Sequence, residues 1–119
     1  MRFRLPVRQS ILAAIIALVL GQAAAFAASP DPKIGAHISA QCAACHGSNG
    51  MSVDTSIPNL AGQHYVYLVT QLKAFKDRSR ISPLMNELAR PLTQEQIEDI
   101  AAYYDSLPIE VGKPSKSKL

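Results

Sequence analysis

The chain has 119 residues, with 12 Lys or Arg against nine Asp or Glu and a formal net charge of +3. Three of the arginines fall within the first eight residues, so the rest of the chain is nearly neutral and gives no reason to expect a nucleic-acid partner. The length suits one small domain. A domain of this size without tryptophan has a small hydrophobic core, so we expect a covalent cross-link or a cofactor to stabilise it.

The first segment is typical of a secretory signal peptide. The three arginines precede an apolar run at 11–20, and small residues follow it, ending in Ala-Phe-Ala at 25–27. That order predicts a leader over residues 1–27 that is removed on export to the bacterial periplasm. The aliphatic run is short for the ~20 residues that a membrane span needs, but retention of the segment as an anchor stays open.

The next stretch is expected to contain one helix and one long loop. After a flexible start at 28–32, apolar residues at helical spacing predict a helix over 33–45. Glycines and polar residues at 47–50 end it in a turn. Residues 51–63 show no periodicity and contain Pro58, so we expect a loop there.

A second helix is predicted from Tyr65 to about Arg78, because apolar residues recur there at i, i+3, i+4 and i+7. Residues 81–92 contain two prolines and are predicted to form a mixed loop with room for one helical turn.

The last predicted helix begins at Thr93, which forms a capping box with Gln96, and it ends at Pro108. A polar tail follows at 109–119. No alternating pattern typical of a strand occurs in the chain. The domain from 33 to 108 is therefore expected to be all-α, with three main helices, and its long loops are reasonable if they wrap a cofactor.

Cysteine occurs only at Cys42 and Cys45, and His46 follows directly. Such a pair can be a redox dithiol, half of a zinc site, a disulfide or the covalent anchor of a c-type haem. A thioredoxin-type dithiol is expected on a βαβ pattern, which is absent, and a structural zinc site needs a fourth ligand. A disulfide leaves the histidine unexplained. We therefore predict one covalent haem c, with thioether bonds to both cysteines and His46 as the proximal iron ligand.

The sixth iron position decides the chemistry, and a methionine there raises the reduction potential. Met51 follows His46 too closely to leave the proximal side, whereas Met85 lies in a proline-flanked stretch that can reach the opposite face. We predict Met85 as the distal ligand, with apolar core filler as its alternative role. His37 and His64 are rivals, but His37 lies close to the anchor and His64 opens the second helix.

Three stretches carry a resemblance to a known family: CAACHG, PNLAGQ followed by YVYLVTQL, and DIAAYYDSL. With them, residues 33–108 resemble the class I cytochromes c, specifically the cytochrome c4 and c553-like branch. The resemblance implies the class I cytochrome c fold, in which three main helices and long loops wrap around one covalently bound haem. Cytochrome c4 proteins have two haem domains, whereas this chain has one haem motif.

The resemblance also implies roles for single residues. Cys42 and Cys45 match the thioether cysteines, and His46 and Met85 match the proximal and distal ligands. The carbonyl of Pro58 is expected to accept a hydrogen bond from the free ring N–H of His46, which fixes the tautomer of the imidazole.

Three further positions can be compared with the family. Gly35 matches the small residue where the first and last helices cross, and Tyr103 or Tyr104 would be its aromatic partner. Many relatives have a second methionine three positions after the ligand, where this chain has Leu88.

With two axial ligands bound, iron has no open position for a substrate, so the remaining chemistry is one-electron transfer between redox proteins. We expect a periplasmic electron carrier rather than an enzyme, with no nucleic-acid partner and no membrane span once the leader is removed. The haem edge near the cysteines is the expected docking face. Six apolar residues are expected to wall the haem: Leu60, Leu68, Leu72, Ile81, Leu84 and Leu92.

Two alternatives stay open. The chain can be the electron-accepting haem subunit of a dehydrogenase, such as a flavocytochrome sulfide dehydrogenase. If Met85 does not bind iron, it can instead be an open-site haem enzyme or sensor.

Overall fold

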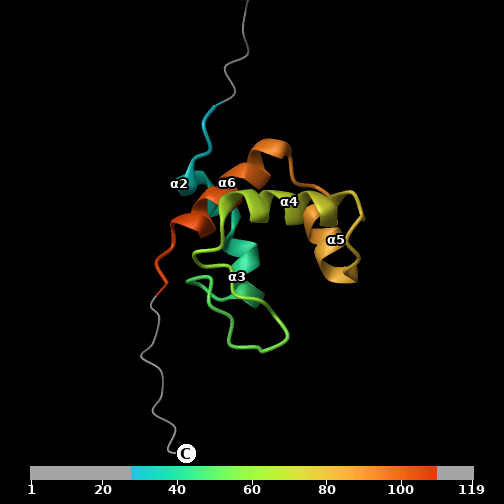
Figure 1. Ribbon diagram of the computed structural model, residues 1–119, viewed down its shortest axis with the longest axis horizontal. Coiled ribbons are helices and arrows are strands. Elements are labelled where there is room, and N and C mark those ends of the chain that lie inside the picture. Colours follow the sequence, from blue (N-terminus) through green and yellow to red (C-terminus); the bar gives the residue numbers. More distant parts are fainter. Residues whose placement is uncertain (1–27, 110–119) are drawn as a thin grey trace, which may run out of the picture.

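Residues 28–109 are described by the computed structural model, and within them all regular structure is helical. The helices in Figure 1 are, in chain order, α2 (Pro32–Ile38), α3 (Ala40–His46), α4 (Tyr65–Lys76), α5 (Pro83–Ala89) and α6 (Gln94–Ser106). The predicted all-α fold is confirmed for this part of the chain. The predicted leader (1–27) and all but the first residue of the predicted tail lie outside the described residues.

The predicted first helix is two short helices that meet at Ser39. The backbone N–H of Ser39 still donates to the carbonyl of Gly35 at 2.8 Å, but its own carbonyl accepts from both Cys42 (2.9 Å) and Ala43 (3.1 Å). A bond from residue i+3 tightens the turn toward 3₁₀ geometry, which interrupts the regular α-helix. The prediction of one continuous helix over 33–45 is corrected accordingly.

The segment predicted as a mixed loop contains a regular helix, α5. Ser82 is its N-cap, with its Oγ accepting from the backbone N–H of Met85 at 3.4 Å, and Pro83 lies in the first turn. Proline is tolerated there because its missing N–H would have no intrahelical partner in any case. Pro83 therefore begins a helix and Pro91 follows its end, and the prediction of a loop over 81–92 is wrong for its central part.

The last helix begins as predicted. The Thr93 Oγ1 accepts from the backbone N–H of Gln96 at 3.1 Å, and the Gln96 Oε1 accepts from the backbone N–H of Thr93 at 2.9 Å. This reciprocal pair satisfies two N–H groups that a helix start otherwise leaves without partners. The capping box is confirmed, and α6 consequently starts at a defined residue.

A glycine allows α2 to cross α6 at very short range. A Cβ at Gly35 would lie 2.0 Å from the carbonyl oxygen of Asp99 and 2.9 Å from the Cβ of Tyr103, so no larger residue fits without moving a helix. Of the two tyrosines expected at this crossing, Tyr103 is the one in contact. The crossing fixes α2, and through it the start of α3, against α6.

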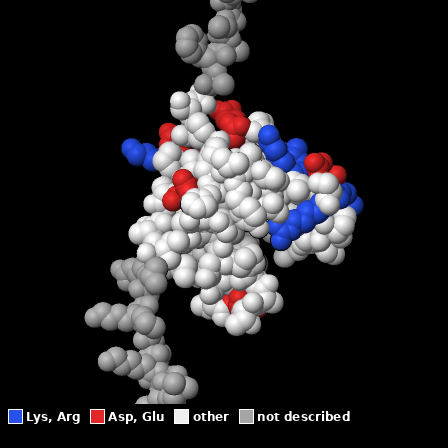
Figure 2. Space-filling model, viewed as in Figure 1, with Lys and Arg blue, Asp and Glu red and all other residues white. Residues whose placement is uncertain are grey.

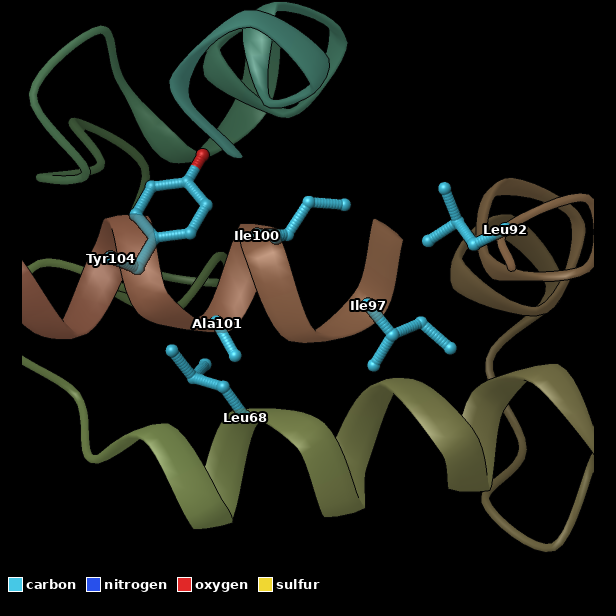
Figure 3. Packing of buried hydrophobic residues seen from close by; sticks show 6 residues of the cluster. All are labelled: Leu68, Leu92, Ile97, Ile100, Ala101 and Tyr104. Atoms are coloured by element: carbon cyan, nitrogen blue, oxygen red, sulfur yellow. The ribbon is translucent and has the colours of Figure 1, made fainter. Parts of the chain in front are cut away.

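The helix α6 has two buried faces, which Figure 3 shows. Ile97 and Ala101 point toward Leu68 on α4, whereas Ile100 and Tyr104 point to the other side of α6, away from α4. Together with Leu92 these residues form the hydrophobic core. Among the described residues no helix is long and apolar enough to cross a membrane.

Candidate cofactor site

One cavity of ≈ 420 Å³ gathers all five predicted site residues: Cys42, Cys45, His46, Pro58 and Met85. Its walls come from α3, the loop after it, α4, α5 and α6. In Figure 1, α3 and α5 both project from the same side of the layer that α4 and α6 form. All six residues predicted as the apolar wall also line the cavity: Leu60, Leu68, Leu72, Ile81, Leu84 and Leu92.

The two cysteines lie on the last turn of α3, three residues apart and both facing the cavity. Both are free thiols; Cys42 is half-buried and Cys45 is exposed. Burial raises the pKa of the Cys42 thiol above its ordinary value, so the group is neutral near pH 7. Two free thiols that face the same cavity suit covalent attachment of a large apolar group.

The imidazole of His46 is buried and oriented by a backbone carbonyl. Its Nδ1 lies 2.8 Å from the carbonyl oxygen of Pro58. Because a carbonyl oxygen accepts hydrogen bonds and cannot donate, Nδ1 must carry the proton and donate it. The other ring nitrogen, Nε2, then holds a lone pair that is available to a metal.

The loop that supplies Pro58 is folded back under α3 by its glycines. Gly47 ends α3 with φ +85°, and a Cβ on it would lie 2.1 Å from the carbonyl oxygen of Met51. The carbonyl of Gly50 then accepts from the backbone N–H groups of Leu60 (2.8 Å) and Ala61 (3.0 Å), which closes the loop. The chain therefore returns beside His46 within a dozen residues.

The thioether of Met85 comes to the same cavity from α5. Met51 is 39% exposed and does not line the cavity. The rival imidazoles of His37 and His64 are exposed and also lie off the cavity. Within residues 28–109, His46 and Met85 are thus the only histidine and methionine on the cavity wall.

Sequence reasoning missed a charged group in the wall, the guanidinium of Arg80. Its Nη1 donates to the Oε1 of Gln71 at 2.6 Å, and its Cζ lies 4.5 Å from the centroid of the Phe75 ring. Among the residues of 28–109 that line the cavity, Arg80 is the only Lys, Arg, Asp or Glu. No local pattern in the sequence marks it, because the turn that precedes α5 determines where its side chain lies.

A second missed residue is Tyr104, which closes the inner end of the cavity. Its side chain is 1% exposed, and Figure 3 shows the hydroxyl pointing toward α3. Burial raises the pKa of Tyr104 to about 12, and the neighbouring Cys42 adds to this rise. The phenol therefore remains protonated at neutral pH.

These residues fit a haem. The cavity has apolar walls, two thiols on one edge, an imidazole with an unprotonated Nε2 and a thioether from a different helix. One cation in the wall suits a cofactor that carries carboxylates.

Comparisons with known proteins agree with this chemistry. The family model for cytochrome c matches residues 32–108. Cytochrome c4 of Thiocapsa roseopersicina is 45% identical over 83 residues, which are 69% of this chain and 43% of that protein. The cytochrome subunit of sulfide dehydrogenase from Chlorobaculum tepidum is 40% identical over 73 residues, or 61% of this chain and 66% of that protein.

A solved structure is also similar. Reduced recombinant cytochrome c4 from Pseudomonas stutzeri superposes with a TM-score of 0.65 and 37% identity, covering 70% of this chain and 48% of that chain. The present chain therefore spans about half the length of the cytochrome c4 proteins that it matches.

Proposed function

The chain belongs to the cytochrome c family, in its cytochrome c4 branch, and from this premise we propose that it carries single electrons through one haem with His46 and Met85 as axial ligands. The resemblance predicted from the motifs is thus confirmed, together with the class I cytochrome c fold and haem c as the cofactor. The observation that supports the ligand pair is that no other histidine or methionine of residues 28–109 lines the cavity.

Four side chains would hold the haem: Cys42 and Cys45 through thioether bonds, and His46 and Met85 at the iron. The bound haem supplies an iron centre that alternates between the ferrous and ferric states. The Pro58 carbonyl accepts from the His46 Nδ1, so in the neutral imidazole the lone pair that would bind iron is on Nε2.

The surrounding residues suit a carrier better than an enzyme. With an imidazole and a thioether both assigned to iron, the iron would have no open position for a substrate. A methionine ligand favours a high reduction potential, and the apolar wall adds to this because a low dielectric disfavours the extra positive charge of the ferric state. Arg80 would pair with a haem carboxylate at the polar edge of the cavity.

We assign the activity to the bacterial periplasm, because residues 1–27 have the pattern of a signal peptide. Fractionation of cells that express the full chain should place the haem protein in the periplasm, with an N-terminus at or near Ala28. Recovery with the membranes and an intact leader would instead support an anchored form.

The partners are proposed to be other redox proteins. A second candidate role is that of a haem subunit within a dehydrogenase, which the similarity to the cytochrome subunit of sulfide dehydrogenase favours. Size-exclusion chromatography of the native periplasmic fraction separates the two roles: a carrier elutes as a small protein, whereas a subunit elutes in a stable larger complex.

The ligand pair is tested by optical spectroscopy of the holoprotein. We expect the ferric wild type to show the weak far-red band that reports a methionine–iron bond. We expect its ferrous form not to bind carbon monoxide. Met85→Ala should lose the band and bind carbon monoxide. Met51→Ala is the matched control, because Met51 is exposed and off the cavity. A wild type that is high-spin and binds carbon monoxide would establish the open-site alternative.

A further inference from the structure

A buried asparagine adjoins the proposed distal ligand and has no assigned role. The side chain of Asn86 is 5% exposed and makes three hydrogen bonds to the backbone. Its Nδ2 donates to the carbonyls of Phe75 at 2.6 Å and Arg80 at 2.9 Å, and its Oδ1 accepts from the backbone N–H of Ser82 at 2.8 Å. Both amide hydrogens and one acceptor position are therefore used.

The three partners of Asn86 belong to three successive parts of the chain. Phe75 lies in the last turn of α4, Arg80 in the connecting turn and Ser82 at the N-cap of α5. One side chain thus ties the end of α4, the turn and the start of α5 to one another. Because Met85 is the neighbouring residue in α5, this tie also determines where the thioether lies.

Other contacts hold this part of α5 less firmly. The helix has seven residues, too few to be stable without packing. The hydrogen bond from Met85 to the cap Ser82 is long, at 3.4 Å. The ion pairs of Glu87 with Arg78 and Arg90 are exposed, and exposed pairs contribute little. The bonds of Asn86, at 2.6–2.9 Å and buried or part-buried, are therefore the strongest side-chain restraint that we find on the first turn of α5.

We propose that Asn86 is a positioning residue that holds Met85 in place as the distal ligand. The inference rests on the proposed function, because it takes Met85 to bind iron. Asn86 does not touch the cavity itself, since it is absent from the wall, and it acts through the backbone that it shares with Met85. Without its bonds, α5 is free to shift and the thioether leaves the iron more often.

The isosteric variant Asn86→Asp tests this directly. It keeps the size of the side chain and the acceptor for Ser82, but it loses both donors and places a carboxylate oxygen against two carbonyl oxygens. We expect the ferrous variant to bind carbon monoxide at least roughly tenfold faster than the wild type, as the loss of about one buried hydrogen bond implies. The far-red ferric band of the variant should be weaker than that of the wild type. When the pH is raised, the band of the variant should disappear at a lower pH than the band of the wild type does.

A purely structural role predicts a different result, and Ile97→Ala serves as the matched control. Ile97 is fully buried in α6 and lies off the cavity, so its truncation destabilises the fold without touching the ligand turn. We expect this variant to unfold at a lower temperature while it keeps the far-red band and its resistance to carbon monoxide. Asn86→Ser, a smaller change, provides a second test if Asn86→Asp does not take up haem, and it should show the same defect in milder form.

The outcomes separate the two proposals. If neither the ferrous wild type nor either Asn86 variant binds carbon monoxide, the positioning role is wrong and the ligand assignment stands. If Ile97→Ala opens the haem as far as the Asn86 variants do, general destabilisation explains the effect and the inference is overturned. If the wild type itself binds carbon monoxide, the proposed function fails first and the inference fails with it.

Discussion

The ring nitrogen Nδ1 of His46 donates to the carbonyl oxygen of Pro58 across 2.8 Å, so a loop residue twelve positions away sets the tautomer of the imidazole. The acceptor is a main-chain atom, and the bond therefore depends on the path of the loop rather than on the proline side chain. The loop is in turn closed by the Gly50 carbonyl, which accepts two backbone N–H groups.

Replacing Pro58 by alanine should leave the haem spectrum unchanged, because the carbonyl acceptor remains. The folded protein should lose up to about 1 kcal/mol of stability, since alanine gives the unfolded chain more conformational freedom. Optical spectra and chemical unfolding of the holoprotein measure the two effects. A changed axial ligation in this variant would mean that the proline ring, and not the carbonyl alone, holds His46.

Arg80→Gln should lower the reduction potential. Removing a cation beside the haem favours the ferric state, and an interaction of about 0.7 kcal/mol at this exposed position corresponds to roughly 30 mV for one electron. Lys73→Gln is the control, because Lys73 is an exposed cation of α4 that does not line the cavity. Redox titration at low and high salt measures the reduction potentials of the two variants and of the wild type. Equal shifts in both variants would show that Arg80 has no specific place at the haem.

Gly35→Ala should destabilise the fold by about 1–3 kcal/mol or more, because its Cβ would overlap the carbonyl of Asp99 and force α2 away from α6. The control is Ala36→Ser on the exposed side of the same helix, which should cost less than about 1 kcal/mol. Denaturant unfolding measures both values. A Gly35→Ala protein as stable as the control would show that the two helices do not cross this closely.

The stability of the protein should fall above about pH 10. The pKa of Tyr104 is raised to about 12 in the folded state, against an ordinary value of 10.0. Between these values the folded state keeps a proton that the unfolded state has lost, so stability decreases as pH rises, by up to about 1.4 kcal/mol per pH unit. Below pH 10 both states are protonated and the contribution does not change.

Tyr104→Phe should remove most of this alkaline slope, since phenylalanine does not titrate. Tyr67→Phe, at an exposed position, is the control and should keep the slope. Unfolding at a series of pH values between 8 and about 12 compares the three proteins. If the wild type and Tyr104→Phe lose stability in parallel, another group is responsible.

Much of the site follows from residues that are neighbours in the chain. Cys42, Cys45 and His46 share one helical turn, so their spacing alone predicts an anchor and a ligand. Met85 could be selected because few alternatives exist: the sequence has three methionines, one of them at the start of the predicted leader. Part of the apolar wall was predictable because Leu68 and Leu72, at helical spacing, must face either the core or the cofactor.

Other features could not be predicted, because they depend on groups that are distant in sequence. The prolines at 83 and 91 indicated a loop, but a serine cap and packing against α4 make the intervening residues a helix. Arg80 reaches the cavity because its turn folds back on Phe75, and Asn86 matters because three backbone groups from 75–82 converge on it. No single-residue propensity contains this information.

The amino-acid sequence by itself determined where α6 begins and which side chains can be proposed for the chemistry: two thiols for the cofactor, and an imidazole and a thioether for iron. These are local properties of side-chain type and spacing. The tertiary structure decided which polar groups adjoin these side chains, namely the Pro58 carbonyl at His46, the guanidinium of Arg80 in the cavity wall and the amide of Asn86 beside Met85. Hydrogen bonds form only at short range, so these partners are known only once the packing of the helices has brought distant backbone together.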